Sequence, residues 1–250
     1  MTRAGLDRPH SHEGDPGAQR ALCAGMQFTP PSWLGPGIAA RTKFIDDQVL
    51  AAIDAGLPQV VICGAGYDDR ALRFRTAGVR FFELDHAGTQ ADKARRLRAL
   101  GADDSGLTLA PADFRTDDVQ AVLEKCGHDP SQPSLFICEG LLVYLDQHTC
   151  VRLLSGLVAR APAGSVLAAS LATHADGSDS AVVIAAANAR RRTGDAEPWR
   201  TILPASRHLG LLERAGWLVT GTADSAVPAA DVSHGRRSLL VTAVAGQPGQ

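Results

Sequence analysis

Short apolar runs alternate with amphipathic segments along most of the chain. Runs rich in β-branched and aromatic residues predict strands at Gln59–Cys63, Val79–Leu84, Leu107–Ala110, Ser134–Cys138, Ser165–Leu171, Trp217–Thr220 and Ser238–Val244. Apolar positions at helical spacing predict helices at Ile38–Ala55, Thr89–Leu100, Asp117–Cys126, Gln147–Ala161, Ala181–Arg192 and Leu209–Ala215. Apolar strands that alternate with helices are typical of a parallel sheet covered on both faces. We therefore expect an α/β fold with a mostly parallel, seven-stranded sheet, whose last two strands pair antiparallel.

The start of the chain lacks this periodicity. Residues 1–20 are polar and rich in glycine, proline and histidine, so we expect a mobile tail there. The proline-rich segment Thr29–Gly37 predicts a loop. No later shift of composition marks a boundary, so residues 21–250 are expected to form a single domain.

Composition and charge exclude several classes of protein. The 250 residues are 45% hydrophobic and 21% charged, which is the usage of a globular chain rather than a disordered one. The formal net charge of −2 provides no strong field for nucleic acid or anionic lipid. The longest apolar runs, such as Ser165–Leu171, fall well short of the roughly 20 residues that cross a bilayer. We expect neither a nucleic-acid nor a membrane partner.

Cysteine usage indicates the compartment. The chain has five cysteines and no CxxC pair: Cys23, Cys63, Cys126, Cys138 and Cys150. An odd number without such pairs argues against a disulfide framework and a structural zinc site, and no other cluster has the spacing of metal ligands. Because the first twenty residues also lack a signal-peptide pattern, we expect a reduced, cytoplasmic protein without a metal.

Candidate chemistry follows the predicted strands. Gly64-Ala65-Gly66 comes directly after the first strand, where glycines allow the backbone to approach a ligand, although a tight turn without a ligand needs the same residues. The dinucleotide fingerprint requires a small residue at position 69, where this chain has Asp69. A carboxylate beside a pyrophosphate is unfavourable, so the motif favours a nucleoside ligand without phosphates.

Carboxylates end the next two predicted strands. Asp85 lies 21 positions after Gly64, an interval typical of an acid that binds ribose hydroxyls; a helix N-cap is the other interpretation. Glu83, two residues earlier on the same strand face, is a weaker candidate. Asp113, followed by Phe114, could accept a hydrogen bond from the exocyclic amine of adenine, or it could be a turn residue.

Two further positions complete the candidate site. Glu139 follows the fourth strand among apolar residues, where an acid is costly unless it has a partner. Tyr144, five residues later, is either a substrate contact or part of the core. Arg41, in the helix before the first strand, could pair bidentately with a carboxylate or be a solvated helix charge.

Together these segments resemble the leucine carboxyl methyltransferase family of class I enzymes, which use S-adenosylmethionine (SAM). The resemblance extends from about residue 38 to 171, and more faintly to Trp217. It is carried by five motifs in order: Arg41-Thr42-Lys43, GAGYDDRALR at 64–73, FELDHAGTQADK at 82–93, Ala112-Asp113-Phe114 and CEGLLVYL at 138–145. It implies a Rossmann-like class I methyltransferase fold and SAM as the cofactor.

The resemblance also implies roles on the cofactor side. Arg41 would hold the SAM carboxylate, and Asp85 would bind the ribose hydroxyls. Gly64, with Gly66 in the same turn, would pass beneath the methionyl part. The resemblance places Asp113 with Phe114 at adenine, and Glu139 at the SAM amino group.

Arg70 matches an arginine of the family's GAGxDxR pattern, and this arginine could either bind the ligand or stabilise the structure. Arg70 and Tyr144 are the candidates for positioning the substrate, and no catalytic residue is assigned. The chain departs from the family pattern at Asp69, usually Thr, and at Ala87, usually Pro. The region before Arg41 is short, so the substrate pocket is expected to be more open or built differently.

The implied reaction is methyl transfer to a substrate oxygen. A carboxylate is already ionised at neutral pH and needs no base, whereas a phenol or alcohol does. Of the eight histidines, four are candidates for such a base, and none of the four has an evident partner in the sequence: His86, His148, His174 and His208. We therefore expect a small-molecule carboxylic acid as the substrate, with a phenol or alcohol as the alternative.

Residues 172–204 fall where class I methyltransferases carry substrate-covering elements. This segment is predicted to be a lid whose Arg190, Arg191 and Arg192 attract an acidic substrate, unless they are only a solvated helix end. Two other functions stay open. One is a NAD(P)-dependent oxidoreductase, which Asp69, Arg41 and Glu139 argue against; the other is a non-catalytic SAM-binding protein.

Overall fold

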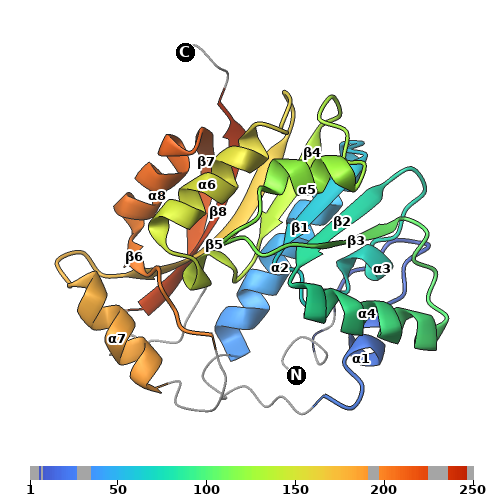
Figure 1. Ribbon diagram of the computed structural model, residues 1–250, viewed down its shortest axis with the longest axis horizontal. Helices are drawn as coiled ribbons and strands as arrows, with labels where there is room; N and C mark the ends of the chain where they lie inside the picture. The colour runs from blue at the N-terminus through green and yellow to red at the C-terminus, as the bar shows by residue number, and fades with distance from the viewer. Residues whose placement is uncertain (1–5, 7, 27–34, 191–196, 225–235, 247–250) are drawn as a thin grey trace.

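A parallel sheet forms the centre of the molecule. The computed structural model describes residues 6, 8–26, 35–190, 197–224 and 236–246. Eight strands form one sheet in the order β3-β2-β1-β4-β5-β8-β7, with β6 beside β5 (Figure 1). The strands are β1 (Gln59–Cys63), β2 (Arg80–Asp85), β3 (Leu107–Pro111), β4 (Ser134–Cys138), β5 (Val166–His174), β6 (Leu203–Pro204), β7 (Trp217–Asp224) and β8 (Arg236–Ala245).

The pairing confirms the predicted α/β sheet. β1, β2, β3, β4 and β5 pair parallel, and β8 joins β5 and β7 antiparallel. The prediction of seven strands is wrong by one, because β6 is only two residues long and ends in Pro204. A two-residue segment is too short to show the pattern of apolar residues that predicts a strand.

Helices cover both faces of this sheet (Figure 1). They are α1 (Ala18–Leu22), α2 (Gly35–Asp54), α3 (Arg70–Arg73), α4 (Ala87–Leu100), α5 (Val119–Lys125), the 3₁₀ turn η3 (Leu142–Tyr144), α6 (Gln147–Val158), α7 (Ser180–Arg190) and α8 (Ala205–Arg214). Helices α5, α6 and α8 share one apolar cluster with the sheet, whereas α2 and α3 share the cluster on the other face. None of the described helices combines the length and apolarity required to cross a membrane.

Alternation along β1 shows how the sequence divides the two clusters. Val61 and Cys63 pack with the α5–α6–α8 side, while Val60 and Ile62 pack with the α2 side, and all four are at most 1% exposed. Successive side chains of a strand point to opposite faces. A strand buried on both sides must therefore be apolar throughout.

The N-terminal segment differs from the expectation of a mobile tail. Residues 8–20 have defined contacts, because Ser11 N donates to Arg73 O over 3.0 Å and the Arg8 side chain is only 6% exposed. Helix α1 then packs Ala18 and Leu22 against Leu72 of α3. These contacts could not be read from the polar composition of the segment, because their partners lie about 40 to 60 positions further along the chain.

Several element boundaries also differ from the predictions by a few residues. Helix α2 begins at Gly35, inside the expected loop, because Pro36 is tolerated in a first helical turn; residues 29–34 of that loop lie outside the described residues. Helix α8 begins at Ala205 rather than Leu209. Helix α7 is described to Arg190, and Arg191 and Arg192 lie outside the described residues.

Candidate functional site

A pocket lies where the strand order reverses. β1 pairs with β2 on one side and with β4 on the other, and ligands of such sheets bind beyond the carboxyl ends of the strands at this point. Segments following β1, β2, β3 and β4 all contribute to the pocket. Its lining residues are Gly64, Asp85, His86, Asp113, Phe114, Arg115, Gly140, Leu141, Tyr144, Leu145 and Glu197. The structure thus brings together five of the predicted site residues: Gly64, Asp85, Asp113, Phe114 and Tyr144.

The turn after β1 requires its glycines. Gly64 and Gly66 have φ of 69° and 53°, in a backbone region that residues with a Cβ atom rarely adopt. A Cβ on Gly64 would lie 3.0 Å from Cδ1 of Leu141, which also lines the pocket. Glycine at position 64 therefore shapes this wall of the pocket as well as the turn.

Asp85 is held by the same turn. One of its oxygens accepts a hydrogen bond from Gly66 N over 2.7 Å, and the other accepts one from His86 N, also over 2.7 Å. Each carboxylate oxygen has a second lone pair. Asp85 is therefore fixed in the pocket and still able to accept hydrogen bonds from a ligand.

Asp113 and Phe114 line the pocket just after β3, the strand that pairs with β2. Arg115 donates to both oxygens of Asp113, over 3.1 and 2.8 Å. These hydrogen bonds lower the pKa of Asp113 to about 2, so the carboxylate is ionised at any ordinary pH. The ring of Phe114 is 8% exposed, which leaves its edge at the pocket wall.

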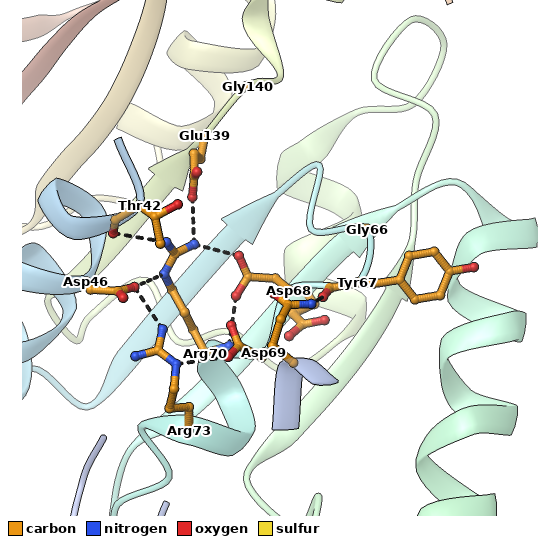
Figure 2. Close-up of polar contacts among 12 residues, drawn as sticks. Thr42, Asp46, Gly66, Tyr67, Asp68, Asp69, Arg70, Arg73, Glu139 and Gly140 are labelled. Atoms are coloured by element: carbon orange, nitrogen blue, oxygen red, sulfur yellow. Dashed lines mark hydrogen bonds and ion pairs between the residues drawn. The ribbon is translucent and has the colours of Figure 1, made fainter. Parts of the chain in front are cut away.

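Arg70 is fully buried at the centre of a charge network beside the pocket. Its guanidinium donates to Asp46, Asp68 and Glu139 over 2.7, 2.6 and 2.7 Å (Figure 2). Burial disfavours its charge, but these carboxylates hold its pKa well above the ordinary value. Arg70 therefore organises the turn and does not line the pocket, which favours a structural role for this arginine.

Glu139 connects this network to Arg41. Its Oε1 accepts from Arg41 Nε over 2.9 Å, and its Oε2 accepts from Arg70. The Arg41 side chain keeps 27% of its surface exposed, whereas the Glu139 side chain keeps 3%. A Cβ on Gly140, a pocket residue, would lie 3.4 Å from the Arg41 guanidinium. The two residues therefore adjoin the pocket as one ion pair.

The sequence argument from Asp69 is wrong. Its carboxylate is 1% exposed and pairs with Arg73 over 2.9 Å and with Arg8 over 2.9 Å, so it does not line the pocket. An acid at this position thus says nothing about whether a pyrophosphate would be tolerated. Arg41 and Glu139 remain as arguments against a dinucleotide.

Glu83 has a separate partner on the α4 side of β2. Its carboxylate pairs with the fully buried Lys93, which also donates to Asp68 O. Burial outweighs the attraction of Lys93 and raises the pKa of Glu83 to about 7. Glu83 is therefore a buried structural acid, while Asp85 on the same strand reaches the pocket.

The four histidines considered as candidate bases have different surroundings. His86 lines the pocket, and His148 is exposed on α6. His174 accepts from or donates to Ser180 Oγ over 2.7 Å, and His208 Nε2 donates to Ala172 O over 2.8 Å. Burial lowers the pKa of His208. Neither His174 nor His208 lines this pocket.

No sequence pattern predicts one part of the pocket wall. Glu197 lines it from a segment whose Arg200 and Thr201 amides both donate to Val143 O, over 2.7 and 3.1 Å. The Thr201 hydroxyl donates to Leu145 O over 2.6 Å. These hydrogen bonds attach the segment after residue 196 to η3, and only the fold shows that it reaches the pocket.

Similar proteins were found by sequence and by structure. The family description "Leucine carboxyl methyltransferase" matches residues 17–158. A protein of Frankia alni, provisionally named as an S-adenosyl-L-methionine-dependent methyltransferase, is 40% identical over 141 residues, which cover 55% of this chain and 48% of the relative. The chain thus spans about half the length of this curated relative.

Two solved structures share the fold at low sequence identity. A methyltransferase structure from Thermobifida fusca superposes with a TM-score of 0.62 at 16% identity, covering 98% of each chain. Magnesium protoporphyrin IX methyltransferase from Synechocystis, solved with bound S-adenosylhomocysteine, gives 0.57 at 14% identity and covers 91% of this chain and 92% of that one. The sheet topology is therefore that of class I methyltransferases. With the motifs gathered at one pocket and the family match over more than half of its length, the chain belongs to the leucine carboxyl methyltransferase family.

Proposed function

We propose that this chain is a SAM-dependent O-methyltransferase that methylates a carboxylate of a small molecule. The observation that carries the proposal is the meeting of the turns after β1, β2, β3 and β4 at one pocket, in a chain of this family. SAM-dependent methyl transfer is also the activity given in the name of the Frankia alni relative. The substrate class rests on the chemistry of the reaction and on the absence of an assigned base.

The donor set of the pocket fits SAM. Asp85 offers its remaining lone pairs to the ribose hydroxyls, and Gly64 leaves room above the turn. Phe114 provides an apolar edge for adenine, and Asp113 would share its carboxylate between the exocyclic amine and Arg115. The exposed part of Arg41 is available for the SAM carboxylate, and Glu139, held by Arg41 and Arg70, would share its carboxylate with the amino group.

The chain contributes binding, orientation and exclusion of water. SAM supplies a methyl group on a sulfonium sulfur. The chemistry available from bound SAM would be transfer of this methyl group to a substrate oxygen with release of S-adenosylhomocysteine, and a carboxylate oxygen would have no proton to lose. Tyr144, on the pocket wall, would orient the substrate, and the segment between β5 and β6 would act as a lid; residues 172–174 and 203–204, expected in the lid from the sequence, belong to the central sheet instead.

Methyl transfer from labelled SAM to a panel of small carboxylic acids, phenols and alcohols tests this function. We expect base-labile methyl esters, formed only from the acids. Base-stable ethers would replace the carboxylate with a hydroxyl acceptor, for which His86 is the histidine of the pocket. Saturable SAM binding without any methyl transfer would indicate a non-catalytic SAM-binding protein, and hydride transfer from a nicotinamide would overturn the proposal.

A further inference from the structure

The N-terminal clasp, residues 8–15, runs along α3 behind the pocket. Ser11 N donates to Arg73 O over 3.0 Å, Asp15 N donates to Leu72 O over 3.1 Å, and Arg73 donates back to Pro9 O. The clasp contributes no residue to the pocket lining. Any effect on the pocket must therefore pass through the residues that the clasp contacts.

Arg8 is the charged group of the clasp. Its Nε and Nη2 donate to the two oxygens of Asp46 over 2.9 and 3.1 Å, and its Nη1 donates to both oxygens of Asp69 over 2.9 and 3.0 Å. Arg8 thus joins α2, which carries Asp46, to the residue that precedes α3. Such forked pairing fixes geometry, because a guanidinium is planar and rigid.

Arg8 supplies a cation to buried carboxylates of the network. The arginine–carboxylate network of the described residues contains four arginines and four carboxylates: Arg8, Arg41, Arg70, Arg73, Asp46, Asp68, Asp69 and Glu139. Removing one partner from a buried ion pair leaves an uncompensated charge. Loss of Arg8 would therefore take a cation away from both Asp46 and Asp69.

A continuous path of ion pairs runs from Arg8 to Arg41. Asp46 Oδ1 accepts from Arg70 Nε over 2.7 Å, Arg70 Nη1 donates to Glu139 Oε2 over 2.7 Å, and Glu139 Oε1 accepts from Arg41 Nε over 2.9 Å. At 27%, the Arg41 side chain is far more exposed than the other seven, which stay at 6% or less. A shift within the buried part of the path would therefore be expressed at Arg41, beside the pocket.

We propose that Arg8 is a positioning residue for the cofactor site: it closes the network that holds Arg41 and Glu139 toward the amino-acid end of SAM. The inference rests on the proposed SAM site and names a determinant of it that lies outside the pocket. The adenosine end of the ligand is bound by Asp85 and Phe114, which have no ion pair to the network among the described residues. The two ends of the ligand should therefore respond differently to the loss of Arg8.

Calorimetric titration of Arg8→Ala with two ligands tests the proposal. S-Adenosylhomocysteine carries the amino acid, whereas 5′-methylthioadenosine keeps the adenosine and the thioether without it. We expect the dissociation constant of the first to rise about tenfold or more, and that of the second to change less than about twofold. In an Arg41→Ala background the further loss on Arg8→Ala should disappear, as expected for coupled residues.

Two further variants distinguish a loss of positioning from a loss of folding. Arg8→Lys keeps the charge but loses the fork, and it should show the same selective loss to a smaller degree. Adding Asp69→Thr to Arg8→Ala removes a carboxylate that has lost its Arg8 partner, and should restore part of the affinity for S-adenosylhomocysteine. Arg75→Ala is the matched control, since Arg75 binds Glu13 O of the same segment and has no ion pair to the network; it should leave both affinities unchanged.

The outcomes separate the proposals. Unchanged affinity of Arg8→Ala and Arg8→Lys for S-adenosylhomocysteine would overturn the positioning role, and so would an equal loss of affinity for both ligands. If the wild-type chain binds neither ligand, the proposed SAM site itself fails, and the positioning role fails with it.

Discussion

The two ends of the central sheet carry buried polar groups of very different kinds. At the carboxyl end, the arginine–carboxylate network is built from full charges and continues to the partly exposed Arg41. At the amino end, His128 and Ser134 share a hydrogen bond of 3.0 Å, and Gln59 donates to Ser134 over 3.1 Å. Arg160 donates to His128 Nδ1 over 3.3 Å and caps this amino-end cluster.

The comparison shows how structural and functional polar groups differ. The polar atoms of the amino-end cluster hydrogen-bond to one another, and none of its residues lines the pocket at the carboxyl end. The network at the carboxyl end has the same packing role, but two of its members, Arg41 and Glu139, adjoin the pocket. Burial of polar groups alone therefore does not mark a site; a chain of partners that reaches a ligand surface does.

The largest effect is expected at Asp46, which accepts hydrogen bonds from Arg8, Arg70 and Arg73. Asp46→Asn leaves three buried guanidinium groups short of a carboxylate and should lower the free energy of unfolding by about 3–5 kcal/mol. Asp47→Asn is the control, because Asp47 forms only a surface pair with Lys43 and should cost less than about 1 kcal/mol. Urea unfolding of both variants measures the difference, and equal losses would contradict the central role of the network.

A pH dependence is expected at the amino end. Burial, with repulsion from Arg160, lowers the pKa of His128 to about 4, whereas an unfolded histidine titrates near 6.5. Because the unfolded chain binds the proton more readily, this contribution is complete above about pH 6.5 and is lost as the pH falls toward 4, to a limit of about 3 kcal/mol. The difference in unfolding free energy between wild type and His128→Gln should therefore shrink between pH 7 and 4. A constant difference would contradict a neutral, buried His128; the exposed His148→Gln is the control.

Ser134→Ala tests whether the amino-end cluster is purely structural. The substitution removes the partner of His128 Nε2 and one of the hydrogen bonds of Gln59, and should cost about 1–2 kcal/mol of unfolding free energy. The affinity for S-adenosylhomocysteine, measured by calorimetry, should stay unchanged. A weaker affinity would remove the distinction between the two ends of the sheet.

The smallest expected effect is on the glycine turn. Gly64→Ala and Gly78→Ala both place a side chain at positive φ, 69° and 81°, but only the first meets a pocket residue, Leu141 at 3.0 Å. We expect both variants to lose stability, and only Gly64→Ala to bind S-adenosylhomocysteine more weakly, by about tenfold. Equal binding by the two variants would mean that this wall of the pocket does not touch the ligand.

Much of the fold follows from local patterns in the sequence. The apolar runs located seven strands, and the spacing from Gly64 to Asp85 predicted two residues that the structure brings to one pocket. These signals are local because a strand and the turn after it lie within a few residues of each other.

The rest depends on contacts between distant residues. Arg8 lies 38 positions from Asp46 and 61 from Asp69, and nothing near Arg8 in the sequence marks it as buried. For the same reason the sequence alone does not show that Asp69 is buried away from the ligand, or that Glu197 lines the pocket. A charged residue can be assigned to a buried network only when the fold shows which residues lie beside it.

The most direct test of the account is calorimetric titration of wild type and Asp85→Ala with S-adenosylhomocysteine, with NAD as the parallel ligand and the exposed Asp104→Ala as the control. The account predicts saturable binding to wild type and to Asp104→Ala, a loss of about a hundredfold in Asp85→Ala, and no binding of NAD. Undiminished affinity in Asp85→Ala, or binding of NAD in place of S-adenosylhomocysteine, would contradict it.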